Sequence, residues 1–242
     1  MSSPETLQPI QKIADAEEFA REKARKNGTA RALILRILIT FVALAIWFWT
    51  QSLLGARTSL TEPIGDGLHR LTAPWNAYLH AAPRAANVLL ITSSALIDAI
   101  AIFLLGTWIF AGKLRPFVGL AMLLVTRQVM QALCALPPPP GIIWHHPGFP
   151  SLLVTYGVAN DFFFSGHTAI AVFGAIELAR FRKAWLTVLA IGVVIFEITA
   201  VLVLRAHYTM DVFTGALAAV CVAQVSDAVS DRFARFRVAP AD

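Results

Sequence analysis

Two short polar strings in an otherwise apolar chain together supply two imidazoles and a carboxylate. The first is Phe164-Ser165-Gly166-His167-Thr168, and the second is Arg205-Ala206-His207-Tyr208-Thr209-Met210-Asp211. Each string opens a long apolar run. Asp211 lies four residues after His207, so on a helix the carboxylate shares a face with the imidazole and can orient it and stabilise its positive charge. This spacing indicates a histidine nucleophile with its orienting acid.

The first string also predicts an anion site. Ser165 and Gly166 stand just before the start of an expected helix, where backbone amides are free and the helix dipole is positive. Glycine has no side chain, so a tetrahedral anion can approach the backbone closely. We expect a phosphate group to bind here.

The composition predicts the elements that must position these groups. Of 242 residues, 57% are hydrophobic and only 14% are charged, which is too apolar for a soluble domain and typical of a polytopic membrane protein. Apolar stretches of about 20 residues are long enough to cross a bilayer. They predict an all-α bundle of six transmembrane helices, at residues 30–54, 87–111, 116–136, 163–181, 185–204 and 208–228.

The distribution of charge predicts the topology. Six spans place both termini on one side, and most Lys and Arg residues outside the spans fall on that side, so we expect cytosolic termini. The spans that begin with His167 and His207 then both start at the outer face, where the histidines can meet. The net charge of +5 favours anionic lipid headgroups, and no nucleic-acid partner is expected. The Ala- and Arg-rich composition favours a bacterial inner membrane over an endoplasmic reticulum or Golgi membrane.

The connections divide the chain into three parts. Residues 1–28 are expected to be a cytosolic segment, either an interfacial helix or a disordered tail, that ends at Asn27-Gly28. Residues 29–230 form the transmembrane catalytic domain, and 231–242 a cytosolic tail. Residues 55–86, with three prolines, are expected to be an irregular outer connection. Four prolines at 137–140 end the third span and open the second outer loop.

The two strings resemble the signatures of the type-2 phosphatidic acid phosphatase superfamily, whose Ser-Gly-His and His-x-x-x-Asp motifs catalyse phosphoryl transfer through a phosphohistidine. The finer resemblance is to its lipid phosphotransferase branch, the sphingomyelin synthases and plant phosphatidylcholine:diacylglycerol cholinephosphotransferases. Arg127, nine residues before Leu136-Pro137, is similar to an arginine that those enzymes carry before the same loop. The resemblance covers roughly residues 122–231.

The resemblance implies a role for each matching residue. His207 would attack phosphorus, Asp211 would polarise His207, and His167 would protonate the leaving alcohol and then deprotonate the acceptor. The resemblance and the strings also place phosphate-binding residues at the site: Arg127, Ser165, Gly166 and Arg205. Asp161 and Tyr208 are expected to support them.

Departures from the phosphatase pattern favour the transferase. Phosphatases of the superfamily carry a Lys-x6-Arg-Pro motif and an arginine six residues before the second histidine, whereas Trp108 and Val201 stand at those positions here. The sequence therefore predicts transfer of a phospho-headgroup, phosphocholine or a relative, from a phospholipid to diacylglycerol or ceramide. A lipid phosphatase with the same residues is the nearest alternative. A transporter or scaffold is the alternative from another class.

Several charged residues have simpler interpretations. Arg127 lies deep in its span, as do Asp98 and Glu197, and a buried ion pair among them is an alternative to phosphate binding. Glu177 is expected to be neutralised by Arg180 or Arg182. A zinc site can be drawn from four histidines, but their spacing matches no known ligand pattern, so neither metal nor cofactor is expected; these are His145, His146, His167 and His207.

Overall fold

The computed structural model describes residues 7–55, 65–156 and 162–238 of the 242-residue chain. All regular structure in these ranges is helical, which confirms the predicted all-α class. The helices are α1 (Leu7–Gly55), α2 (Gly67–Leu71), α3 (Ala73–Ala81), α4 (Pro83–Ala111), α5 (Leu114–Leu133), α6 (Gly166–Ala179), α7 (Ala184–Val203) and α8 (Thr209–Val238).

Five stretches within the described ranges are long and apolar enough to cross a membrane, and they indicate an integral membrane protein. They are residues 28–53, 83–111, 114–133, 184–203 and 209–233. The fourth predicted span corresponds to α6, which is apolar but has 14 residues. A helix of that length covers about 21 Å, less than a hydrocarbon core of about 30 Å. The count of six spans and the side of the termini therefore stay predictions.

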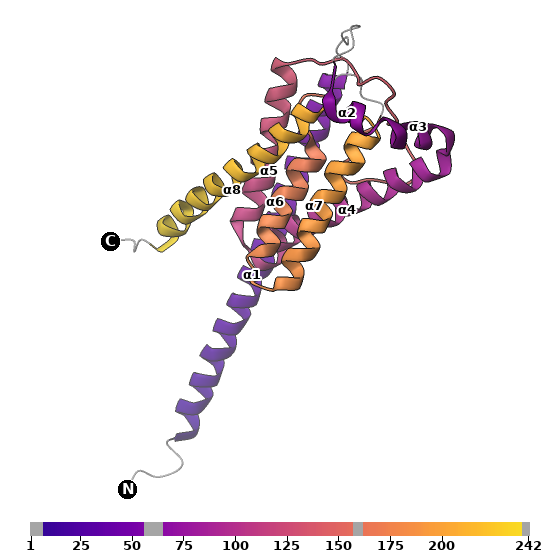
Figure 1. Cartoon of the computed structure of the whole chain (residues 1–242). Helices are drawn as coiled ribbons and strands as arrows, with labels where there is room; N and C mark the ends of the chain where they lie inside the picture. Colours follow the sequence, from indigo (N-terminus) through magenta and orange to yellow (C-terminus); the bar gives the residue numbers. More distant parts are fainter. Residues whose placement is uncertain (1–6, 56–64, 157–161, 239–242) are drawn as a thin grey trace. The chain divides into compact units, whose positions relative to one another are not determined.

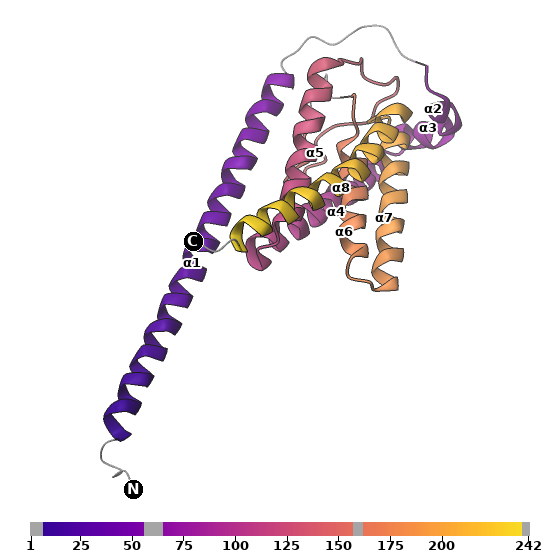
Figure 2. The same ribbon diagram turned by 90° about the vertical axis from the view of Figure 1, so that its left-hand side faces the viewer.

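The short helix α6 is central in the bundle. It packs against α4, α5, α7 and α8 (Figures 1 and 2). Phe173 on α6 is fully buried and belongs to an apolar core that includes Leu104 on α4 and Leu123 on α5. Gly119 and Gly174 leave room at these crossings for the side chains of Phe173 and Ile100, which allows the helices to approach closely. The apolar surface of α6 is therefore largely covered by protein.

Two sequence-based boundaries differ from the structure. The described part of the 55–86 connection is mostly helical, in α2, α3 and the start of α4, and Pro63 lies outside the described residues. Pro74 and Pro83 fall in the first turns of α3 and α4, where the missing amide hydrogen has no helical partner to lose. Asn27-Gly28 does not end α1, since one interior glycine costs only about 1 kcal/mol.

One end of the bundle gathers several connections. The helices α2 and α3 contact α7, and α2 also contacts α8, so they lie near the junction between α7 and α8 (Figure 1). The loop that follows α5 reaches the same junction, because the Ile143 amide donates to the Leu204 carbonyl at 2.8 Å. Both histidine strings begin helices at this end.

Candidate active site

A tight turn after α7 directs His207 back toward the bundle. The helix ends in a Schellman motif, in which the amides of Arg205 and Ala206 donate to the carbonyls of Leu202 and Val201 at 3.3 and 2.9 Å. Arg205 takes the left-handed position of the motif, with φ of 56°. Glycine is the usual residue there, and another residue costs about 1 kcal/mol. Such strain is concentrated at functional sites.

The second string sets the orientation of His207. Its Nδ1 lies 3.5 Å from Asp211 Oδ2, and Asp211 is completely buried. The same Oδ2 accepts the Tyr208 amide at 2.9 Å, which holds the carboxylate in place. The His207 carbonyl accepts a hydrogen bond from His69 Nε2 at 2.9 Å. Because Nδ1 faces the carboxylate, Nε2 is the nitrogen left for attack on a substrate.

The first string is joined to the second through the backbone. Ser165 caps α6, and its Oγ accepts the Thr168 amide at 3.3 Å. The Ser165 amide donates to the Asp211 carbonyl at 3.0 Å. A Cβ at Gly215 on α8 would lie 2.5 Å from the Ser165 carbonyl oxygen, so only glycine permits this approach. The starts of α6 and α8, and with them His167 and His207, are therefore fixed against each other.

Both histidines line one small cavity of about 40 Å³. It also receives Arg127 and Gly166, and its other lining residues are mainly apolar or aromatic: Trp47, Ile97, Leu124, Trp144, Leu153, Val154, Thr155, Ile170 and Ala206. Within the described ranges, the buried Nε2 of His167 has no hydrogen-bond partner. A water or a ligand group in the cavity would satisfy this atom.

Arg127 on α5 lies against the start of α6. Its Nη1 donates to Gln51 Oε1 at 2.7 Å, and its guanidinium carbon lies 5.3 Å from the Trp47 ring centroid, a cation–π contact. A Cβ at Gly166 would lie 3.2 Å from Arg127 Nε. The guanidinium is thus held beside the helix N-terminus at which the sequence predicts an anion.

The carboxylates considered as partners for Arg127 are engaged elsewhere. Asp98 accepts the amides of Leu152 and Leu153 at 2.7 and 3.1 Å. Glu197 accepts the Ser93 hydroxyl at 2.6 Å. In the described part of the chain, the hydrogen bonds of Asp98 therefore go to the loop that precedes α6, and that of Glu197 goes to α4.

Other residues predicted for the site lie around it. Arg205 does not line the cavity, and its Nη2 donates to the His69 carbonyl at 2.6 Å. Tyr208 donates its hydroxyl to the Pro137 carbonyl at 3.1 Å, and its ring stacks on His69 at 5.6 Å between centroids. Both side chains therefore stabilise the connection between α7 and α8, which contains His207. Asp161 lies outside the described residues.

Sequence reasoning missed Asp66 and His69, which support that connection. Asp66 Oδ1 accepts the His69 amide at 3.0 Å and the Thr209 hydroxyl at 2.7 Å, and its Oδ2 accepts the Thr209 amide at 2.6 Å. One carboxylate thus caps both α2 and α8. The available signal was Asp66 itself, because aspartate is a common N-cap residue. The segment around it was expected to be an irregular connection.

Burial and hydrogen bonding determine the charges of Asp66 and His69. Burial alone would raise the pKa of the Asp66 carboxyl, but the hydrogen bonds from Thr209 and His69 outweigh it and lower this pKa below its usual range. Burial lowers the pKa of the His69 imidazole, so the ring is neutral at pH 7. Its partner at Nε2 is a carbonyl oxygen, so Nε2 carries the proton.

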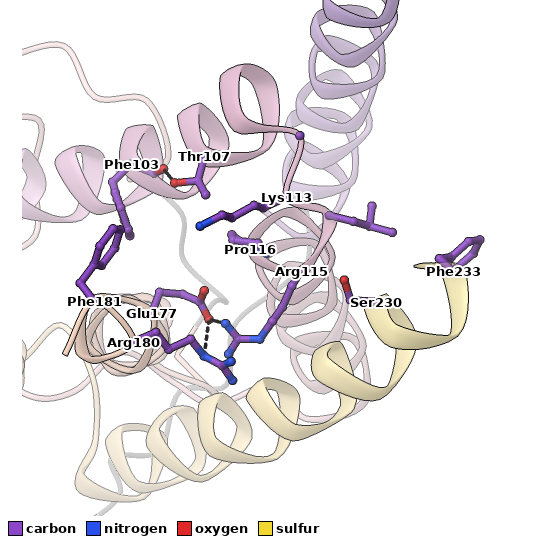
Figure 3. Close-up of a pocket in the computed structure, with 12 residues that line it drawn as sticks. Phe103, Thr107, Lys113, Arg115, Pro116, Glu177, Arg180, Phe181, Ser230 and Phe233 are labelled. Carbon is purple, nitrogen blue, oxygen red and sulfur yellow. Dashed lines mark hydrogen bonds and ion pairs between the residues drawn. The ribbon is translucent and has the colours of Figure 1, made fainter. Parts of the chain in front are cut away.

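A larger cavity, of about 590 Å³, lies at the opposite helix ends (Figure 3). Arg115 forms ion pairs with Glu177 and Asp227, and Arg180 lies 3.9 Å from Glu177 and 2.5 Å from Asp227. The predicted neutralisation of Glu177 by Arg180 is confirmed, with Arg115 as a further partner. Among the described residues that line this cavity there is no histidine, so the histidine chemistry that the sequence predicts is not expected here.

The loop histidines occupy separate places. His145 Nε2 contacts Asn87 Oδ1 at 2.8 Å, and the His146 ring meets the Tyr156 ring at 5.6 Å between centroids. In the ranges that the structure describes, no three His, Cys, Asp or Glu side chains are grouped to hold a metal ion.

The Gly166→Ala variant tests the contact between Arg127 and α6. The new Cβ would press on Arg127 Nε and Cδ at 3.2 and 3.3 Å, so the guanidinium must shift. We expect kcat/KM to fall roughly tenfold, with little change in the unfolding temperature. The matched control is Gly192→Ala on α7, where a Cβ meets no atom of the described residues within 4 Å. Equal activity of the two variants would contradict the role of this contact.

The helical bundle and its paired histidine strings belong to an integral membrane enzyme that acts on phosphate groups. The family model of AtPDCT1/2, plant phosphatidylcholine:diacylglycerol cholinephosphotransferase, matches residues 66–228, and the chain belongs to this family. Among solved structures, the crystal structure of Aquifex aeolicus LpxE has a TM-score of 0.48 at 20% identity, covering 65% of this chain and 92% of that chain. A search of curated proteins finds no match.

Proposed function

We propose that this protein transfers a phosphorylated headgroup, phosphocholine or a close relative, from a phospholipid to a lipid alcohol such as diacylglycerol or ceramide. The observation that carries the proposal is the convergence of His207, His167 and Arg127 in one cavity whose remaining lining is mainly apolar. Membership of the AtPDCT1/2 family supports it. On the predicted six-span topology, the cavity belongs to the non-cytosolic side of the membrane, favoured as a bacterial inner membrane.

In the first step, His207 Nε2 attacks the phosphorus of the donor lipid. A P–N bond forms as the bond between phosphorus and the glycerol oxygen breaks, and the bonding pair leaves with that oxygen. His167 donates a proton to it, and the first lipid alcohol departs. Asp211 stabilises the positive charge that develops on His207. Arg127 and the amides at the start of α6 bind the phosphate oxygens.

In the second step, the acceptor alcohol enters and His167 removes its proton. The alkoxide oxygen attacks phosphorus, the P–N bond breaks, and His207 regains its electron pair. The apolar and aromatic lining favours an acceptor with a hydrophobic body over bulk water at this stage. That preference is the basis for choosing transfer over hydrolysis, since His207, His167 and Asp211 would have the same roles in both reactions.

A label-partition experiment tests this choice. Purified protein in mixed micelles receives headgroup-labelled phosphatidylcholine with diacylglycerol or ceramide, and mass spectrometry follows the label. We expect label on the acceptor lipid and little free phosphocholine. Label recovered mainly as free phosphocholine would replace the proposal by a phosphodiesterase. If the His167→Ala and His207→Gln variants both moved lipid across vesicle membranes as well as the unaltered chain does, without chemical change, the transporter alternative would stand.

A further inference from the structure

We propose that the aromatic side chains of Trp144, Tyr156 and His146 form the subsite for the quaternary ammonium group of the donor headgroup. The proposal rests on the proposed function and assigns a specificity element to it. The first observation is a second cavity, of about 470 Å³, next to the catalytic one. Trp144 and Val154 line both cavities, so the second cavity adjoins the place where phosphorus must lie.

Three rings that contact one another line this second cavity, those of Trp144, Tyr156 and His146. The Trp144 and Tyr156 rings lie 5.0 Å apart between centroids with a tilt of 36°, and His146 meets Tyr156 at 5.6 Å and 70°. The other edge of Trp144 approaches the His167 ring at 5.3 Å, nearly at right angles. Trp144 is thus the shared wall between catalytic histidine and aromatic cavity. In phosphocholine a two-carbon bridge separates the phosphate oxygen from the ammonium, so the two groups must occupy neighbouring positions.

The walls of this aromatic cavity are fixed before a ligand arrives. Trp144 Nε1 donates to the Thr155 carbonyl at 3.1 Å. The Tyr156 hydroxyl is hydrogen-bonded to the Ser94 hydroxyl on α4, so the loop ring is anchored to the bundle. Both rings are half-buried. Fixed rings lose little conformational entropy on binding, which favours a cation held by cation–π contacts.

The charges around the cavity favour a cation without N–H groups. The described lining residues include no Lys or Arg. Ser151, one of them, contacts Asp98 Oδ1 at 3.5 Å, so a carboxylate lies behind the wall. Its oxygens already accept the Leu152 and Leu153 amides. A primary ammonium gains most of its binding energy from hydrogen-bond acceptors, whereas a trimethylammonium group needs only ring faces and a negative potential.

Equilibrium binding of soluble headgroups tests the subsite apart from catalysis. The probes are phosphocholine, phosphoethanolamine and inorganic phosphate, titrated against the purified full chain in detergent micelles. We expect phosphocholine to bind about tenfold more tightly than phosphoethanolamine, equivalent to about 1.4 kcal/mol. Tyr156→Leu should remove this preference. Tyr156→Phe, the matched control, loses the hydroxyl bond to Ser94 but keeps the ring face, so it should retain most of the preference, and inorganic phosphate should bind all three proteins equally.

The outcomes separate the subsite from the proposed function. Equal binding of the two headgroups by the unaltered chain, or a preference that survives in Tyr156→Leu, would overturn the aromatic subsite even if transfer were observed. A preference removed by Tyr156→Leu would support the subsite even if the label experiment showed hydrolysis. Tyr156 is chosen over Trp144 for the test because Trp144 also contacts the ring of His167.

Discussion

Replacing His207 by glutamine is expected to lower turnover on the order of 10³-fold or more, because the substitution removes the group that we propose forms the covalent bond to phosphorus. Glutamine keeps a polar side chain of similar reach but is not a nucleophile. The interactions that hold the surrounding turn are made by the backbone carbonyl of His207 and by the Tyr208 amide, and both persist in the variant. The protein should therefore fold and insert normally.

Two measurements check this expectation. Initial rates of label transfer give the loss in turnover, and intact-protein mass spectrometry after incubation with phosphatidylcholine alone should show a phosphocholine adduct on the unaltered chain and none on His207→Gln. The matched control is His80→Gln on α3, an exposed histidine that contacts the Gly141 carbonyl, which should keep full activity. Full turnover in a correctly inserted His207→Gln protein would exclude the phosphohistidine mechanism.

The sequence was sufficient to predict that the two histidine strings meet, because the patterns involved are local. The spacing of His207 and Asp211 and the Ser165-Gly166 helix start follow from neighbouring residues, and hydrophobic stretches located the long helices. The meeting of the two strings needed only the alternation of spans across a membrane. The structure then places His167 and His207 in one cavity.

What the sequence did not predict depends on contacts between distant segments. Asp66 bonds to Thr209, 143 residues away, and Arg127 to Gln51, 76 residues away. No periodicity or motif encodes such a pairing. Arg205 is a second example. Its place beside the second histidine string suggested a phosphate contact, whereas in the structure its guanidinium donates to the His69 carbonyl.

The glycines show how local composition becomes site geometry. Gly215 allows the start of α6 to reach α8, and Gly166 allows the guanidinium of Arg127 to lie beside the first turn of α6. Neither position needs an unusual backbone angle. Each is explained by what a side chain would touch, which only the packed structure reveals. The catalytic groups therefore depend on small residues that have no chemistry of their own.

Removing the imidazole of His167 should separate the two half-reactions. With a natural phospholipid donor, His167→Ala is expected to lose about 10²- to 10⁴-fold in turnover, since neither the leaving alcohol nor the acceptor then exchanges its proton with a positioned group. The donor p-nitrophenyl phosphocholine has a leaving group that is stable without a proton. Its first step therefore needs only His207.

With that activated donor, His167→Ala should release one equivalent of nitrophenolate per protein and then stall with the phosphocholine adduct on His207. The unaltered chain should turn over continuously when diacylglycerol is present, and His207→Gln should give no burst. Continuous turnover by His167→Ala would show that another group deprotonates the acceptor. Because the buried Nε2 of His167 has no hydrogen-bond partner in the described part of the chain, its removal breaks no hydrogen bond at that atom, and a stalled adduct would assign the imidazole to the chemistry.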